Sequence, residues 1–168
     1  KEKCTYYSVN KQGDRHHGVG LIIRKNQQPK FGKVSERISK ATLKIEDINI
    51  AIIAIYAPTN SCSEKDPSER DKLYEQLGSE IKRLPNKEFL IILGDFNAKT
   101  GSGHNEFPEQ IGKYGKGFMN SSGRLLLETC LQYELVLSNT LFSHRLSHRT
   151  TWTAPYREYI SHDGTYRR

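Results

Sequence analysis

The chain has 168 residues, 35% hydrophobic and 27% charged, a balance that excludes wholesale disorder and is enough for one domain with an apolar core. Its formal net charge of +7 favours polyanionic partners such as nucleic acid over acidic proteins. Residues 1–46 hold eleven Lys and Arg against four Asp and Glu, although a solvated lysine-rich hairpin would explain the same excess. Three widely spaced cysteines, Cys4, Cys62 and Cys130, predict reduced thiols and an intracellular compartment, with the nucleus as one option.

No apolar stretch approaches the roughly 20 residues that a membrane-crossing helix requires, so we expect no membrane contact. Met119 is the only methionine, and the chain begins at Lys1. We interpret residues 1–168 as a single domain that is incomplete at both ends.

Alternating patterns predict the elements of the first half of the chain. β-forming residues at 4–9 and 18–23 predict two strands joined by a hairpin-like loop. Apolar and polar residues alternate from 37 to 46, which predicts a half-exposed strand, whereas residues 48–56 are nearly all apolar and predict a central buried strand. Apolar residues then recur at helical spacing, so residues 68–84 are expected to form an amphipathic helix.

The second half continues this alternation of strands and helices. Residues 89–93 form another apolar run that predicts a strand, and the glycine-rich residues 101–117 predict a loop. Asn120 can cap a helix whose apolar positions extend to Leu131, and residues 135–137 predict a further strand. A layered α/β architecture is therefore expected.

Polar side chains follow two of the predicted buried strands at the point where each strand ends. Asp95 and Asn97 follow residues 89–93, and Tyr56 closes the strand at 48–56. The carboxyl ends of strands are where α/β sheets bind their ligands. Hydrolysis of a phosphodiester needs a carboxylate for the attacking water and neutral donors for the phosphoryl oxygens, and these three residues can supply them. The alternatives are an Asx turn at Asp95 and Asn97, and a tyrosine that covers the edge of the core.

Two histidines, His144 and His148, lie four residues apart in a basic segment that also holds Arg145 and Arg149. A zinc pair is one interpretation, but no cysteine or carboxylate lies nearby to complete it. A loop whose arginines contact the phosphates of a nucleic acid is the interpretation that we favour.

An ordered series of motifs resembles the endonuclease/exonuclease/phosphatase superfamily, and its later blocks look like the branch carried by non-LTR retrotransposons. The series is Gly18-Val19-Gly20-Leu21, Ile55-Tyr56-Ala57-Pro58-Thr59, Leu93-Gly94-Asp95-Phe96-Asn97-Ala98-Lys99-Thr100-Gly101, Asn120-Ser121-Ser122-Gly123-Arg124-Leu125-Leu126, Leu137-Ser138-Asn139-Thr140-Leu141-Phe142 and His148-Arg149-Thr150-Thr151-Trp152. The resemblance spans nearly the whole chain. It implies a four-layered α/β sandwich, with two β-sheets flanked by helices, that cleaves DNA with the help of a divalent cation, usually Mg²⁺.

The resemblance also implies roles for individual residues. Asp95 matches the aspartate that orients or activates the water and would contribute to the metal site. Asn97 matches its partner at the phosphate, and Tyr56 matches the active-site tyrosine. Asn120 matches a polar position near the DNA, although helix capping explains it equally well.

Thr151 and Trp152 match a strand that borders the DNA-facing pocket in the family, although a single tryptophan is also common in a core. The family's principal metal-binding glutamate precedes the strand that residues 18–23 resemble, and its Asp-His pair follows the Thr151 block at a distance. Neither has a counterpart within residues 1–168. We therefore expect residues 1–168 alone to show negligible nuclease activity and marginal stability, with exposed sheet edges and apolar faces.

Three functions are compatible with these patterns. The first is a Mg²⁺-dependent DNA endonuclease domain of the retrotransposon-derived type. The second is a degenerate, co-opted domain that binds nucleic acid or a protein partner without catalysis. The third, a phosphoesterase for inositol lipids or small phosphates, shares the fold but is disfavoured by the retrotransposon-like blocks that begin at Asn120.

Overall fold

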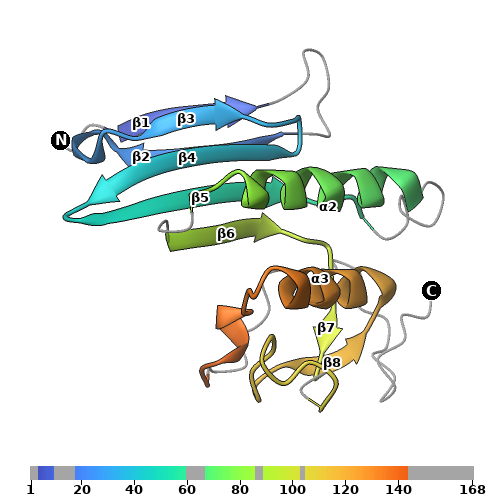
Figure 1. Cartoon of the computed structure of the whole chain (residues 1–168). Helices are drawn as coiled ribbons and strands as arrows, with labels where there is room; N and C mark the ends of the chain where they lie inside the picture. Colours follow the sequence, from blue (N-terminus) through green and yellow to red (C-terminus); the bar gives the residue numbers. More distant parts are fainter. Residues whose placement is uncertain (1–3, 10–17, 60–66, 86–88, 103–104, 144–168) are drawn as a thin grey trace, which may run out of the picture. The chain divides into compact units, whose positions relative to one another are not determined.

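The computed structural model of this chain describes residues 4–9, 18–59, 67–85, 89–102 and 105–143. The chain divides into two compact units, Lys1–Asn97 and Ala98–Arg168 (Figure 1). A single domain over residues 1–168 stays a prediction.

The first unit is built around a four-stranded sheet. Its described elements are β1 (Cys4–Val9), β2 (Val19–Arg24), the 3-10 helix η1 (Lys25–Gln27), β3 (Lys30–Lys33), β4 (Ile38–Ile45), β5 (Ile48–Tyr56), α2 (Pro67–Lys82) and β6 (Phe89–Asp95). The sheet has the order β3-β4-β5-β6, with β5 and β6 parallel, and β1 pairs with β2 in a separate antiparallel hairpin (Figure 1). The predicted strands and helix of this unit are confirmed within about two residues, whereas β3 was not predicted.

Strand β5 is an interior strand of the sheet, as its apolar sequence predicted. Ala54 packs with Ala41 of β4 and Leu21 of β2 in one buried cluster, so the β1-β2 hairpin covers one face of the sheet. Ile53 and Ile55 are almost completely buried and alternate with Ala54 along the strand, so they leave the sheet on its opposite face.

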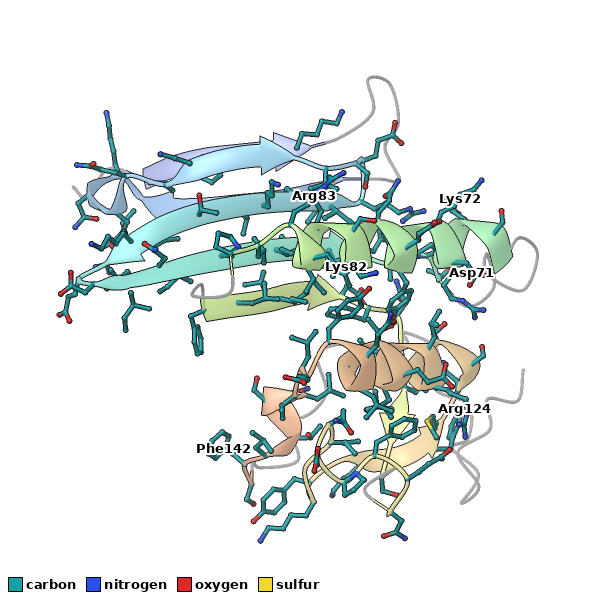
Figure 2. All side chains as sticks on the ribbon, viewed as in Figure 1. Asp71, Lys72, Lys82, Arg83, Arg124 and Phe142 are labelled. Atoms are coloured by element: carbon teal, nitrogen blue, oxygen red, sulfur yellow. The ribbon has the colours of Figure 1, made fainter. Side chains whose placement is uncertain are left out.

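Helix α2 has the amphipathic character that its residue spacing predicted. Leu73 and Leu77 are buried one turn apart, while Lys72 and Lys82 are exposed (Figure 2). No helix among the described residues is both long and apolar enough to cross a membrane.

A partly buried ion pair joins α2 to the sheet. Glu80 of α2 keeps only 5% of its side chain exposed, and its Oε2 accepts a hydrogen bond from Lys40 Nζ of β4 at 2.6 Å. Arg83, directly after the end of α2, donates to the other carboxylate oxygen. Burial alone would raise the pKa of Glu80, but the hydrogen bonds and positive charges of Lys40 and Arg83 outweigh it and hold this pKa below its ordinary value.

We expect Glu80→Gln to reduce the free energy of unfolding by roughly 1–3 kcal/mol at pH 7, because it removes the charge that Lys40 and Arg83 stabilise. A lowered pKa in the folded state adds stability above the unfolded-state pKa, and this stability is lost as the pH falls through the folded-state value. The cost of the substitution should therefore shrink below about pH 4.5. Urea unfolding at pH 7 and pH 3 measures this difference, with Glu75→Gln on the exposed side of α2 as the matched control. An equal cost at both pH values would contradict the prediction.

Strand β6 exposes apolar side chains on one of its faces. Phe89 is 62% exposed, and the alternate residues Ile91 and Leu93 are also exposed. In the part of the chain that the structure describes, β6 pairs with β5 along one edge and forms no ladder along the other. The exposed sheet edge and apolar face expected from the sequence are thus present at β6.

The described residues of the second unit, 98–102 and 105–143, form a short hairpin and one α-helix. Its described elements are β7 (Thr100–Gly101), β8 (Lys116–Met119), α3 (Ser121–Gln132) and the 3-10 helix η3 (Ser138–Thr140). Leu127 of α3 packs with Phe107 and Ile111 in a buried cluster. Cys130 of α3 is a buried free thiol, and this burial raises its pKa to about 11.

One prediction for this unit holds in part and another is wrong. The segment predicted as loop, residues 101–117, is turn and irregular structure at 105–115, but its two ends belong to the β7-β8 hairpin. The strand predicted at 135–137 is reduced to one parallel bridge between Leu137 and Ile111. Strand pairing stops there because Thr140 donates both its N–H, at 3.0 Å, and its hydroxyl, at 2.6 Å, to the carbonyl of Leu137, which turns the chain into η3.

Candidate active site

The carboxyl ends of β5 and β6 bring two of the predicted site residues next to each other. Tyr56 is paired with Asp95 in the parallel register of the two strands. Residues paired in this way point to the same face of a sheet, so the phenol and the carboxylate leave the sheet on the same side. Asp95 is exposed and Tyr56 is half-buried, so the carboxylate is accessible to water and to a ligand.

Gly94 allows β6 to approach β5 closely beside this pair. Its φ of +143° lies in a region that side chains rarely adopt. A Cβ atom on Gly94 would lie 1.9 Å from the carbonyl oxygen of Ile55, which is far inside van der Waals contact. The glycine that precedes Asp95 is therefore required by the backbone geometry of the strand ends.

Asn97 is held at the same edge by hydrogen bonds to both strand ends. Its backbone N–H donates to Oδ1 of Asp95 at 3.0 Å, in the Asx turn that the sequence left as an alternative. Its Nδ2 donates to the carbonyl of Ala57 at 2.8 Å, and Ala57 N–H in turn donates to the carbonyl of Asp95 at 2.8 Å. The structure thus brings Tyr56, Asp95 and Asn97 together, and the turn orients the carboxylate.

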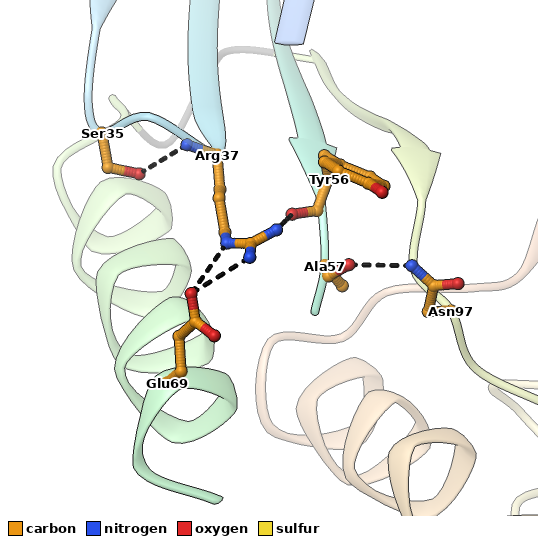
Figure 3. A network of polar contacts seen from close by, with 6 residues as sticks. All are labelled: Ser35, Arg37, Tyr56, Ala57, Glu69 and Asn97. Carbon is orange, nitrogen blue, oxygen red and sulfur yellow. Dashed lines mark hydrogen bonds and ion pairs between the residues drawn. The ribbon is translucent and has the colours of Figure 1, made fainter. Parts of the chain in front are cut away.

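Arg37, just before β4, is a fourth residue at this edge, and the sequence did not single it out. Its Nη1 donates to the carbonyl of Tyr56 at 3.3 Å, and its guanidinium carbon lies 5.5 Å from the centre of the Tyr56 ring. Its Nε and Nη2 donate to Oε1 of Glu69 in α2, at 3.2 and 3.0 Å (Figure 3). A cation therefore lies beside the predicted active-site tyrosine.

The sequence did carry a signal for Arg37. Ile45 pairs with Ile48 across the tight turn between β4 and β5, and this register places Ile38 opposite Ile55. Counting outward from that turn puts Arg37 opposite Tyr56, where Tyr56 N–H donates to the carbonyl of Arg37 at 2.9 Å. The contact with Glu69 had no comparable signal, because it depends on how α2 packs.

Asn120, in the second unit, is the N-cap of α3. Its Oδ1 accepts from Gly123 N–H at 2.8 Å, as a capping side chain does, and also from Lys99 N–H at 3.1 Å. Asn120 N–H returns a bond of 3.0 Å to the carbonyl of Lys99. The capping role that the sequence allowed is confirmed, while a role at the DNA stays a prediction.

We expect Asn120→Ala to lower the free energy of unfolding by about 1–2 kcal/mol, because two N–H groups lose their acceptor. Asn120→Asp keeps that acceptor and is the matched control, with an expected loss close to zero. If Asn120 also contacts DNA, the added negative charge of Asn120→Asp should weaken DNA binding without affecting stability. Urea unfolding and fluorescence anisotropy with labelled DNA measure the two effects separately, and equal destabilisation by both substitutions would contradict the capping role.

Four predicted substrate-binding residues, Arg145, Arg149, Thr151 and Trp152, lie outside the described residues, as do His144 and His148. Their predicted roles at DNA, and the alternative zinc pair, stay predictions.

Asp95 is the residue at this edge that fits a hard divalent cation. Mg²⁺ prefers oxygen ligands, keeps several waters and takes one or two carboxylates. Within the described ranges, no group of three or more His, Cys, Asp or Glu could hold a metal ion. Asp95 could therefore contribute one carboxylate ligand, and a Mg²⁺ site at this edge stays a prediction.

A cavity of about 530 Å³ lies at the other end of the same sheet from Tyr56 and Asp95. It is open and is lined mainly by amide and lysine side chains, including Asn26, Lys30 and Asn49. We place the candidate active site at the strand ends, because the cavity contains none of the acidic residues that the expected chemistry needs.

The chain is similar in sequence to known proteins. The chain is 34% identical over 164 residues to craniofacial development protein 2 of Bos taurus, and 33% identical over 152 residues to the same protein of Tragulus javanicus. These matches cover 96% and 89% of this chain but 26% of each relative, so the chain spans about a quarter of their length. No protein-family model matches it.

Solved structures were matched as well. The endonuclease domain of TRAS1, a telomere-specific non-LTR retrotransposon, matches 77% of this chain and 52% of its own, with a TM-score of 0.52 and 18% identity. An endonuclease/exonuclease/phosphatase family protein from Leptotrichia buccalis C-1013-b matches 58% of this chain and 40% of its own, with a TM-score of 0.44 and 18% identity.

The chain has a mixed α/β fold, as the sequence predicted, and it shares this fold with the endonuclease domain of TRAS1. In sequence, the chain is similar to a part of craniofacial development protein 2.

Proposed function

We propose that this chain supplies part of the active site of a Mg²⁺-dependent endonuclease that hydrolyses phosphodiester bonds in DNA. The observation that carries the proposal is the pairing of Tyr56 with Asp95 at the carboxyl ends of two parallel strands, with Asn97 bonded to both ends. A neutral donor and an oriented carboxylate on one side of a sheet edge are suited to a phosphate group and an attacking water.

The hydrogen bonds of Asp95 and Asn97 indicate which atoms could take part in each step of the reaction. Oδ1 of Asp95 accepts from Asn97 N–H, so Oδ2 is the oxygen that can orient the attacking water and accept its proton. The water oxygen then bonds to phosphorus while one ester P–O bond breaks. The hydroxyl of Tyr56 and the remaining Nδ2 hydrogen of Asn97 can donate to phosphoryl oxygens without adding negative charge.

A bound Mg²⁺ would neutralise the charge that develops on the phosphoryl oxygens. Asp95 is the described residue that would hold it, and the family resemblance assigns its principal ligand to a glutamate outside residues 1–168. The net charge of +7 supports DNA as the partner, because basic surfaces attract the phosphate backbone.

The test is nicking of supercoiled plasmid by the full encoded polypeptide, including any residues that flank 1–168. We expect open-circular product with Mg²⁺, none with EDTA, and recovery when Mg²⁺ is restored in excess. DNA binding without any nicking over a range of Mg²⁺ and Mn²⁺ concentrations would contradict the proposal.

A second candidate is a domain that binds nucleic acid or a protein partner and catalyses nothing. The observation in its favour is that Asp95 is not joined by two further metal-binding side chains within the described ranges. Retention of plasmid in a mobility-shift assay, with no nicking at any metal concentration, would favour this function.

A further inference from the structure

Arg37 is a largely buried cation that the chemistry proposed above does not use. Its side chain is 12% exposed, and a charge this buried is costly unless it is paired and hydrogen-bonded. All three of its guanidinium nitrogens have acceptors, in Glu69 and in the carbonyl of Tyr56. The guanidinium is therefore fixed in position.

Tyr56 is attached to Arg37 at three points. Its N–H donates to the carbonyl of Arg37 at 2.9 Å, its own carbonyl accepts from Arg37 Nη1 at 3.3 Å, and its ring lies 5.5 Å from the guanidinium carbon. The first two contacts fix the backbone at the end of β5. The third contact restricts the orientation of the ring, because a cation is attracted to the face of an aromatic system.

Glu69 fixes Arg37 from the opposite side. Both Nε and Nη2 donate to the same oxygen, Oε1, so the guanidinium plane is constrained by α2 as well as by β5 (Figure 3). A lysine could not replace these contacts, because its single ammonium lacks the planar fork that reaches Glu69 and the Tyr56 carbonyl together.

We propose that Arg37, held by Glu69, is a positioning residue that orients the Tyr56 hydroxyl toward the scissile phosphate. This inference rests on the proposed endonuclease function, and it adds that the first turn of α2 determines the alignment of the phenol. Arg37 itself touches no reacting atom and acts through Tyr56.

The test compares kcat and KM for nicking by the full encoded polypeptide carrying Arg37→Met, Tyr56→Phe or both. Arg37→Met should lower kcat by roughly tenfold and leave KM within about twofold, because alignment matters in the transition state. In the Tyr56→Phe background, which lacks the hydroxyl, Arg37→Met should cause no further loss. Losses that multiply would show that Arg37 acts independently of the hydroxyl and would overturn the inference.

Two further variants separate positioning from general damage. Arg83→Met makes the same chemical change directly after α2, at a side chain that is 71% exposed, and it should leave kcat unchanged. Glu69→Gln keeps Arg37 and almost the same shape, so it should lower kcat by a smaller factor even if Arg37→Met folds poorly. An unchanged kcat in Glu69→Gln would contradict the role of α2.

A readout independent of nicking separates failure of this inference from failure of the proposed function. In protein with ¹³C-labelled tyrosine rings, the resonance that Tyr56→Phe removes belongs to Tyr56. We expect it to shift in Arg37→Met and Glu69→Gln and to stay in place in Arg83→Met. A resonance that does not respond to Arg37 would overturn the inference whether or not the protein nicks DNA, and absence of nicking by the wild type alone would count against the proposed function.

Discussion

Asp95→Asn is expected to lower the rate of DNA nicking by the full encoded polypeptide by roughly 10²–10⁴-fold, the range for loss of a general acid or base. The substitution is conservative for the fold. Asparagine keeps an Oδ1 that can accept the bond from Asn97 N–H, so the turn after β6 should persist. What is lost is the negative charge that would accept a proton from water and bind Mg²⁺.

The measurement is the initial nicking rate on supercoiled plasmid at saturating Mg²⁺, with urea unfolding as a check on folding. Asp47→Asn is the matched control. It makes the same substitution at a fully exposed carboxylate, in the turn between β4 and β5. A rate within threefold of wild type for Asp95→Asn would remove Asp95 from the chemistry.

Gly94→Ala is expected to destabilise the chain by at least about 4 kcal/mol, which is a large part of the total stability of an ordinary domain. The new Cβ would lie 1.9 Å from the carbonyl oxygen of Ile55, and a backbone oxygen inside the sheet cannot move without disrupting the pairing of β5 with β6. The φ of +143° adds strain of its own.

Gly117→Ala is the control that separates the clash from the backbone strain. Gly117 also has a positive φ, of +82°, but a Cβ there would meet no atom within 4 Å. Its expected cost is about 1–2 kcal/mol, from the φ alone. Urea unfolding followed by circular dichroism compares the two variants, and equal losses would show that the approach of β6 to β5 is less tight than the structure indicates.

The exposed face of β6 could affect measurements of unfolding, because it could promote association between chains. Phe89, Ile91 and Leu93 present apolar surface beside an edge that forms no ladder among the described residues. Exposed apolar edges promote association between chains. Unfolding of residues 1–168 alone should therefore be measured at several protein concentrations.

The sequence by itself determined much of the first unit, because its signals are local. The apolar run of β5 and the helical spacing of α2 each depend on neighbouring residues, and both elements formed where they were predicted. Tyr56 and Asp95 could be expected together because both close apolar strands, and parallel strands end at the same edge.

In the second unit, α3 formed where its cap and apolar spacing predicted it, but the other elements were harder to predict because their local signals are weak. Strands β7 and β8 are short and glycine-rich, and they pair at Gly101, where the backbone has a φ of +65° and a Cβ would lie 2.8 Å from the backbone nitrogen of Met119. At Leu137 a strand-like sequence stopped after one bridge, because Thr140 bonds to the carbonyl of Leu137 and turns the chain.

Only the tertiary structure decided what surrounds the candidate site. The pairing of Arg37 with Tyr56 follows from the register of one hairpin and could have been predicted from the sequence. The contact of Arg37 with Glu69 could not have been predicted in this way. That contact joins residues 32 positions apart and exists because α2 packs on one face of the sheet. The sequence determined which side chains lie at the strand ends. The packing of a helix against the sheet determined which charged groups contact them, because packing depends on surfaces that no local pattern encodes.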